Sequence, residues 1–221
     1  MQIIFSSAII KTFDECPQKF KLKYEENLAI PTENTNFKTG KKIHALANYY
    51  LSGVNIKKFE SHLSQNELEL WNYLKKCTFF NMNTIASEYE LMFKLDTYWL
   101  KGRLDALVKD NNDNYFILDY KTGSIKEDKT YDYQTMIYLL AIEKIYSKNT
   151  NNFNFVYLNL KDQKEISIKL TPELKNEYEL ILKKKCSEIS KIINSPITTN
   201  CPKEKYEKCE YNIICNKAKT D

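Results

Sequence analysis

The chain has 221 residues, of which 43% are hydrophobic and 28% charged, and its formal net charge is +4. These fractions are typical of a folded globular protein, and the length suits one domain with a sizeable core. No stretch approaches the roughly 20 apolar residues of a membrane span, and residues 1–5 lack the features of a signal peptide, so we expect a cytoplasmic location. The mild positive charge does not by itself indicate nucleic-acid binding.

The first 84 residues are predicted to be mainly helical. Ser6 or Ser7 can cap a first helix, and Pro17 suits the first turn of a second. A third helix is expected to start after Gly40, and another should precede the sheet. This part is predicted to form the N-terminal helices of a single domain over residues 1–221.

Residues 85–195 are predicted to form a sheet-and-helix core. Apolar residues alternate over 85–95, 98–108 and 115–121, which indicates strands joined as hairpins. Helical spacing follows over 131–146, a second hairpin over 152–160 and 164–170, and a long helix that begins with Thr171 and Pro172. The expected class is α/β, with a Cys-rich tail over 196–221.

Two carboxylates and a lysine stand at the ends of neighbouring predicted strands. Asp105 ends one apolar run, and Asp119 and Lys121 end the next. Because strand side chains alternate, Asp119 and Lys121 project to one face and Tyr120 to the other. This arrangement is typical of sites that bind a divalent metal and hydrolyse a phosphodiester. The alternative is a surface salt bridge on an ordinary hairpin.

Five segments in order resemble the PD-(D/E)XK nuclease superfamily and, within it, the RecB-like exonucleases, including CRISPR-associated ones. They are residues 6–20, 40–44, 90–93, the pair 102–105 and 119–123, and 134–138. The resemblance implies a restriction-endonuclease-like core, with a central mixed β-sheet flanked by helices. It implies a DNA nuclease, expected to be an exonuclease on single-stranded ends. The alternatives are a structure-specific endonuclease and a DNA-binding subunit beside an integrase or helicase.

The resemblance also implies roles for particular residues. Asp105, Asp119, His44 and the main-chain carbonyl of Tyr120 are expected to hold Mg²⁺ or Mn²⁺. Lys121 is expected to orient the attacking water or to stabilise negative charge on the phosphate. For His44, the alternative is a half-buried helix histidine without a ligand.

Further residues are expected to contact DNA. Gln134 and Tyr138 lie one helical turn apart, and the resemblance places them in the DNA groove, where a tyrosine can stack on a base. The alternative is an exposed glutamine and a half-buried tyrosine. Arg103 is the only arginine in the sequence, and its planar group can bind a phosphate or carboxylate with two bonds. Glu90 is a possible further site residue, favoured over Glu88 by the resemblance.

Four of the six cysteines form a second candidate site. RecB-like exonucleases of the iron-sulfur type carry one cysteine near the N-terminus and three near the C-terminus. The resemblance therefore implies a 4Fe-4S cluster held by Cys16, Cys201, Cys209 and Cys215. Cys201 departs from the family spacing, which leaves zinc and no metal as alternatives.

Overall fold

The computed structural model describes residues 3–30, 36–125, 128–146, 149–193, 195, 207 and 209–215. Its centre is a six-stranded mixed sheet in the order β1-β3-β4-β5-β6, with β2 also paired to β3. The pairs β1/β3 and β4/β5 are parallel and the others antiparallel. The strands are β1 (Ile4–Phe5), β2 (Asn83–Leu95), β3 (Tyr98–Lys109), β4 (Tyr115–Lys121), β5 (Phe153–Asn159) and β6 (Lys164–Lys169).

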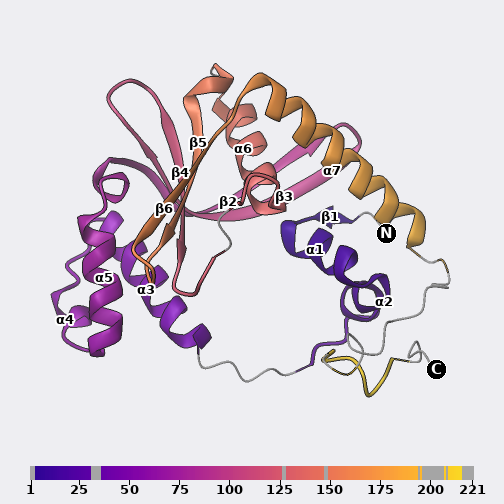
Figure 1. Ribbon diagram of the computed structural model, residues 1–221, viewed down its shortest axis with the longest axis horizontal. Helices are drawn as coiled ribbons and strands as arrows, with labels where there is room; N and C mark the ends of the chain where they lie inside the picture. Colours follow the sequence, from indigo (N-terminus) through magenta and orange to yellow (C-terminus); the bar gives the residue numbers. More distant parts are fainter. Residues whose placement is uncertain are drawn as a thin grey trace.

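Helices cover both faces of this sheet, so the expected α/β class with a helix-flanked mixed sheet is confirmed (Figure 1). The helices are α1 (Ser7–Glu15), α2 (Pro17–Phe20), α3 (Asn36–Leu51), α4 (Lys57–Glu60), α5 (Gln65–Lys76), α6 (Tyr133–Tyr146) and α7 (Pro172–Ile192). A π-helical turn (Lys21–Glu25) follows α2, and two 3₁₀ turns lie at Phe79–Asn81 and Thr150–Asn152.

Two apolar clusters fill the space between the sheet and its helices. On one side, α1, α6 and α7 pack against residues such as Ile117 and Phe155. On the other side, α3 and α5 pack against Leu118 and Tyr120. Neighbouring residues of β4 therefore serve opposite faces, as strand alternation requires. Both faces of β4 are covered, so the chain that leads into Asp119 is held rigidly.

Local capping chemistry explains where the predicted helices begin. The Ser6 side chain accepts the Ile9 N–H at the start of α1, and the Thr171 side chain accepts the Leu174 N–H at the start of α7. Both starts agree with the sequence. Gly40 does not start its helix, because α3 begins four residues earlier, at Asn36. The first 84 residues are not purely helical either, since β1 and the start of β2 belong to the sheet.

The strands β3 and β4 pair over only part of their length. Their ladder runs from Lys109 opposite Tyr115 to Ala106 opposite Leu118 and then stops. Beyond it, the Asp105 carboxylate accepts the Tyr120 N–H at 2.7 Å in place of a main-chain partner. The predicted hairpin is thus correct, and the two strands separate where the polar residues begin.

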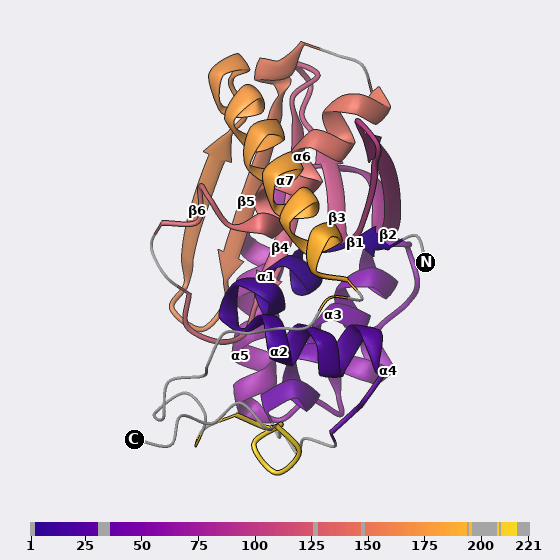
Figure 2. The same cartoon turned by 90° about the vertical axis from the view of Figure 1, so that its right-hand side faces the viewer.

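The described part of the tail lies against the N-terminal region (Figure 2). Glu210 pairs with Lys19 at 3.1 Å, and the Tyr211 hydroxyl donates to the Leu28 carbonyl at 2.8 Å. Cys201 falls outside the described residues. Among the helices of the described ranges, none combines the length and the apolar character needed to span a membrane.

Candidate active site

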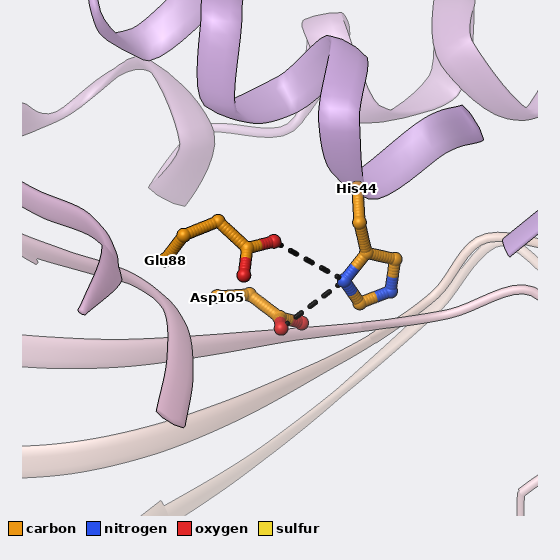
Figure 3. Close-up of side chains that lie close together, drawn as sticks. All are labelled: His44, Glu88 and Asp105. Carbon is orange, nitrogen blue, oxygen red and sulfur yellow. Dashed lines mark ion pairs between the residues drawn. The ribbon is translucent and has the colours of Figure 1, made fainter. Parts of the chain in front are cut away.

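Three side chains from three elements converge beside the gap between β3 and β4. His44 comes from α3, Glu88 from β2 and Asp105 from β3, and both carboxylates point at the same ring nitrogen of His44 (Figure 3). The His44 Nδ1 atom lies 3.1 Å from Asp105 Oδ1 and 3.9 Å from Glu88 Oε1. One ligand atom from each residue lies within 4.8 Å of the other two, which is close enough to hold one metal ion.

The second ring nitrogen of His44 is oriented by the main chain. His44 Nε2 lies 3.0 Å from the Tyr120 carbonyl oxygen, so that carbonyl accepts a hydrogen bond when Nε2 carries the proton. A hydrogen bond of this kind fixes which nitrogen remains available as a metal ligand. The structure thus brings together His44, Asp105 and the Tyr120 carbonyl, as expected from the sequence.

Glu88 reaches this group through an unusual backbone conformation. Its φ is +48°, in the left-handed region that residues with a Cβ seldom adopt. Its neighbours Ser87 and Tyr89 pair with Ala106 and Leu104, so Glu88 lies opposite Asp105 in the ladder. Strained backbone of this kind persists where surrounding structure enforces it, and it often accompanies function.

Glu90, the possible site residue from the sequence, lies elsewhere. It lines a separate cavity together with Ser6, Met92 and Lys101. The structure therefore favours Glu88 over Glu90 as the acidic residue that β2 contributes. Nothing in the sequence marks the positive φ at Glu88, and the two glutamates of this strand could not be told apart by alternation.

Asp119 is buried, with 3% of its surface exposed. Lys121 Nζ lies 3.1 Å from its Oδ1 and 2.8 Å from its Oδ2, and Gln134 Nε2 donates to Oδ1 at 2.5 Å. Despite the nearby ammonium group, Oδ2 accepts no hydrogen bond of regular geometry. Asp119 and Lys121 do share a face, as predicted. That face is covered at Asp119, where Gln134 of α6 contacts the carboxylate.

The carboxylates and the lysine influence one another's protonation. Burial, and then the charge of Asp105, raises the pKa of Asp119 to about 6. Burial lowers the pKa of Lys121, but Asp119 outweighs this and the net shift is upward, so Lys121 remains an ammonium ion. For His44, burial also lowers the pKa, but its hydrogen bond with Asp105 and the charges of both aspartates outweigh burial, so the net shift of the pKa is upward. The two aspartates repel each other, and a cation between them would relieve that repulsion.

The donor set suits a hard divalent cation. Carboxylate oxygens with one imidazole nitrogen are competent ligands for Mg²⁺ and Mn²⁺. Asp119 Oδ2 is buried and pairs with the Lys121 ammonium at 2.8 Å, so the fit to a cation rests on the ligand atoms of His44, Glu88 and Asp105, which lie within 4.8 Å of one another. The residues that are present therefore fit such an ion.

A cleft of about 670 Å³ opens beside the site, and His44, Glu88 and Lys121 are among the residues that line it. It is lined from α3 by Gly40, Lys41, His44, Ala45, Asn48 and Tyr49, from the sheet by Glu88, Arg103, Tyr120 and Lys121, and just after β4 by Thr122 and Gly123. Arg103 Nε lies 2.7 Å from Glu88 Oε2, and 59% of the Arg103 side chain is exposed. The single arginine thus holds the strained glutamate and faces the cleft.

Tyr138 has a structural position rather than an exposed one. Only 7% of its surface is exposed, and its ring stacks on Phe155 with centroids 6.0 Å apart. Its hydroxyl donates to the Arg103 carbonyl at 2.7 Å and accepts from the Arg103 N–H at 3.2 Å. The expected stacking of Tyr138 on a DNA base does not agree with this burial. Gln134 likewise points at Asp119.

Comparisons with known proteins agree with this geometry. Residues 72–216 match the family model of the PD-(D/E)XK nuclease superfamily. The RecB subunit of the RecBCD enzyme from Borreliella burgdorferi is 32% identical over 180 residues, which cover 69% of this chain and 15% of RecB. The chain therefore spans a small part of that relative's length.

A solved structure shows the same fold. It is that of a "Putative exonuclease" from Eubacterium rectale, which superposes with a TM-score of 0.58 at 12% identity, over 88% of this chain and 82% of that one. At this identity the likeness concerns the fold alone. The family match covers Asp105, Asp119 and Lys121, and the chain belongs to the PD-(D/E)XK nuclease superfamily.

Proposed function

We propose that this chain is a Mg²⁺- or Mn²⁺-dependent deoxyribonuclease that acts as an exonuclease on single-stranded ends. One observation carries the proposal. His44, Glu88 and Asp105 place ligand atoms within 4.8 Å of one another, next to the buried Asp119 and its ion pair with the partly exposed Lys121. This combination of clustered hard ligands and an adjacent fixed cation suits hydrolysis of a phosphodiester.

Each residue has a distinct task. His44, Glu88 and Asp105 would hold the cation, and Asp119 is a further proposed ligand beside its ion pair with Lys121. The Tyr120 carbonyl lies in reach of His44. When bound, a divalent cation offsets phosphate charge and lowers the pKa of a coordinated water. Lys121, kept protonated by Asp119, orients the attacking water or stabilises charge that develops on the phosphate. Gln134 holds the Asp119 carboxylate in place.

The choice of DNA rests on the likeness to RecB, a subunit of the RecBCD enzyme. Arg103 and Lys41 supply positive charge along the cleft, where the phosphates of a strand would lie. Single-stranded ends, a cytoplasmic location and an integrase or helicase partner belong to the same proposal. The alternatives are a structure-specific endonuclease and a DNA-binding subunit, and the intact catalytic group disfavours the latter.

We also propose that Cys16, Cys201, Cys209 and Cys215 hold a 4Fe-4S cluster. The support is positional, since the segment with Cys209 and Cys215 contacts Lys19 and Leu28 close to Cys16 in the chain. A cluster would join the two ends of the chain. A zinc ion in the same thiolates is the alternative, and visible absorption distinguishes the two.

The decisive experiment uses labelled DNA in four forms: linear and circular, each single- and double-stranded. Each is incubated with the protein in Mn²⁺, in Mg²⁺ and in EDTA. An exonuclease degrades linear single strands and spares circles. Cleavage of circles indicates an endonuclease, and binding without cleavage in any metal indicates a binding subunit.

A further inference from the structure

The residues of α3 that line the catalytic cleft continue past His44 toward the C-terminal end of the helix. Lys41, Ala45 and Tyr49 are spaced four residues apart, so they form one row on the helix surface beside His44 and Asn48. At 1.5 Å of rise per residue, Tyr49 lies about 7.5 Å along the axis from His44. A strand whose phosphate sits at the metal ligands would therefore reach Tyr49 within one or two nucleotides.

At this end of the cleft, Tyr49 forms an exposed aromatic pair with Phe59 of α4. The rings stack with centroids 5.5 Å apart and an interplanar angle of 23°. Tyr49 is 42% exposed and Phe59 is 51% exposed, although apolar rings are usually buried when a core is available. Neighbouring Tyr50 is 38% exposed, but its ring packs on the buried side chains of Trp71 and Phe80, whereas Tyr49 and Phe59 pack on each other. The Tyr49 and Phe59 pair is thus not needed to fill the core.

A second cavity of about 270 Å³ adjoins the cleft at this pair. Its lining residues are Lys42, Ala45, Leu46, Tyr49, Phe59, His62 and Leu63, and Ala45 and Tyr49 line both cavities. The cavity is predominantly apolar. Lys41 lines the cleft and Lys42 lines the second cavity, where the Lys42 ammonium pairs with Glu67 at 3.0 Å. An apolar space that shares Ala45 and Tyr49 with the cleft suits a flat ring attached to a strand whose phosphates lie in that cleft.

Resting on the proposed function, we propose that Tyr49 and Phe59 form a stacking site for an unpaired base of the substrate strand. The second cavity suits one small ring system, whereas a protein partner needs roughly 800 Å² of surface on each side. A base within a duplex is already stacked and paired, so occupying this site costs unpairing energy. The pair therefore selects single-stranded or frayed ends and sets the position of the strand relative to the metal.

The first test needs no variant of the protein. Single-stranded oligonucleotides, each lacking one base at a different position, are titrated by fluorescence anisotropy in EDTA, where cleavage cannot consume them. The same set is then measured as KM for cleavage in Mn²⁺. Removal of the base at one position should weaken binding by roughly 5- to 150-fold, which is the range expected for the loss of one stack between a base and an aromatic ring.

The second test assigns that position to the aromatic pair. Tyr49→Leu and Phe59→Leu keep an apolar side chain and should weaken binding of the intact oligonucleotide by a similar factor. Removing the sensitive base should then cause no further loss, because both changes remove the same contact. Tyr131→Leu is the matched control, since Tyr131 is 53% exposed and is not among the described residues that line either cavity. It should keep both the affinity and the base sensitivity of the wild type.

The outcomes separate the two proposals. If the wild type cleaves DNA but no position is base-sensitive, or if both leucine variants bind like the wild type, the stacking site is wrong and the nuclease stands. Equal losses on single-stranded and duplex DNA also overturn it. If no metal supports cleavage of any DNA, the proposed function fails, while a single base-sensitive position lost in the leucine variants still supports the site.

Discussion

The ring of Tyr138 occupies the space that a side chain at Gly102 would need. A Cβ built on Gly102 lies 2.2 Å from Cε1 of Tyr138, far inside contact distance. The ring cannot retreat easily, because its hydroxyl bonds both main-chain polar groups of Arg103. Gly102 thus lets Tyr138 of α6 approach β3 closely. This contact lies three residues before Asp105, beyond the point where the ladder between β3 and β4 stops.

Gly102→Ala should lower both stability and cleavage. Overpacking of a core costs about 1–3 kcal/mol, and here the displaced strand carries Asp105. Thermal melting and the rate of DNA cleavage measure the two effects. Gly123→Ala is the control for stability, since a Cβ there meets nothing within 4 Å. A Gly102→Ala protein that melts and cleaves like the wild type would contradict the packing argument.

Asp119→Ala and Lys121→Ala should each abolish cleavage while the protein stays folded and binds DNA. Removing a group that stabilises transition-state charge typically costs 10²–10³ in rate or more. Asp119→Asn is the milder companion, because it keeps the shape and the contact with Gln134 in this buried position. Cleavage rates in Mn²⁺ measure the loss of activity, and melting curves for each variant show whether it is still folded. Near wild-type turnover in either alanine variant would refute the assigned roles.

Glu88→Gln and His44→Ala should each shift the Mn²⁺ dependence of cleavage to higher concentration. Both remove a ligand from the same group, and one lost ligand weakens affinity for a hard cation. Glu90→Gln is a matched control on the same strand, and it should leave the metal dependence unchanged. If Glu90→Gln shifts the Mn²⁺ dependence more than Glu88→Gln does, then Glu90 is the site residue and Glu88 is not.

Local patterns in the sequence predict much of this fold, because they are set by short-range physics. The Ser6 and Thr171 caps, the alternation of β4 and the spacing of α6 all depend on neighbours within a few residues. Asp105, Asp119 and Lys121 follow from the same alternation once the hairpin is recognised.

Other features depend on contacts between distant segments and could not be read in advance. Glu88 has a positive φ between two residues that pair with β3, and its carboxylate pairs with Arg103, both of which are distant in the chain. The burial of Tyr138 requires a glycine 36 positions earlier in the chain. A Gln-xxx-Tyr spacing places both side chains on one helix face, but only the tertiary structure shows that this face lies against the sheet.

In EDTA, the contribution of Asp119 to the stability of the protein should rise as the pH falls from about 7 to about 4. The pKa of Asp119 is about 6 in the native protein and 3.8 in the unfolded chain, so the native state binds this proton more tightly. The raised pKa of His44 acts in the same direction. Protonated His44 stabilises the native state, and this stabilisation is lost as the pH rises through the pKa that His44 has in the native protein. Melting temperatures of the wild type and Asp119→Asn across this range give the Asp119 part by difference.

Mn²⁺ should reverse this trend, because metal ligands must be deprotonated. The stabilisation by Mn²⁺ should therefore grow as the pH rises. If wild type and Asp119→Asn show the same pH dependence in EDTA, the raised pKa of Asp119 is wrong.

Cys209→Ser and Cys215→Ser should lower the melting temperature and remove any brown colour, with the nuclease residues untouched. The described tail is held to the N-terminal region by the Lys19–Glu210 pair and by Tyr211. A partly exposed ion pair contributes at most about 1 kcal/mol, so it cannot hold the tail firmly. Thiolate ligation joins points almost the whole chain apart, where closing the loop stabilises most.

The control is Cys186→Ala, which affects a fully buried thiol in α7. It should lower the melting temperature by creating a cavity, but iron content and visible absorption should not change. Iron, sulfide and zinc analysis of protein purified without oxygen separates a cluster from a zinc site. Because Asp105 and Asp119 lie in the sheet, any loss of cleavage in the tail variants should follow the loss of structure. The cluster is excluded if the purified protein contains neither iron nor zinc and both serine substitutions leave its melting temperature unchanged. The nuclease assignment does not depend on that outcome.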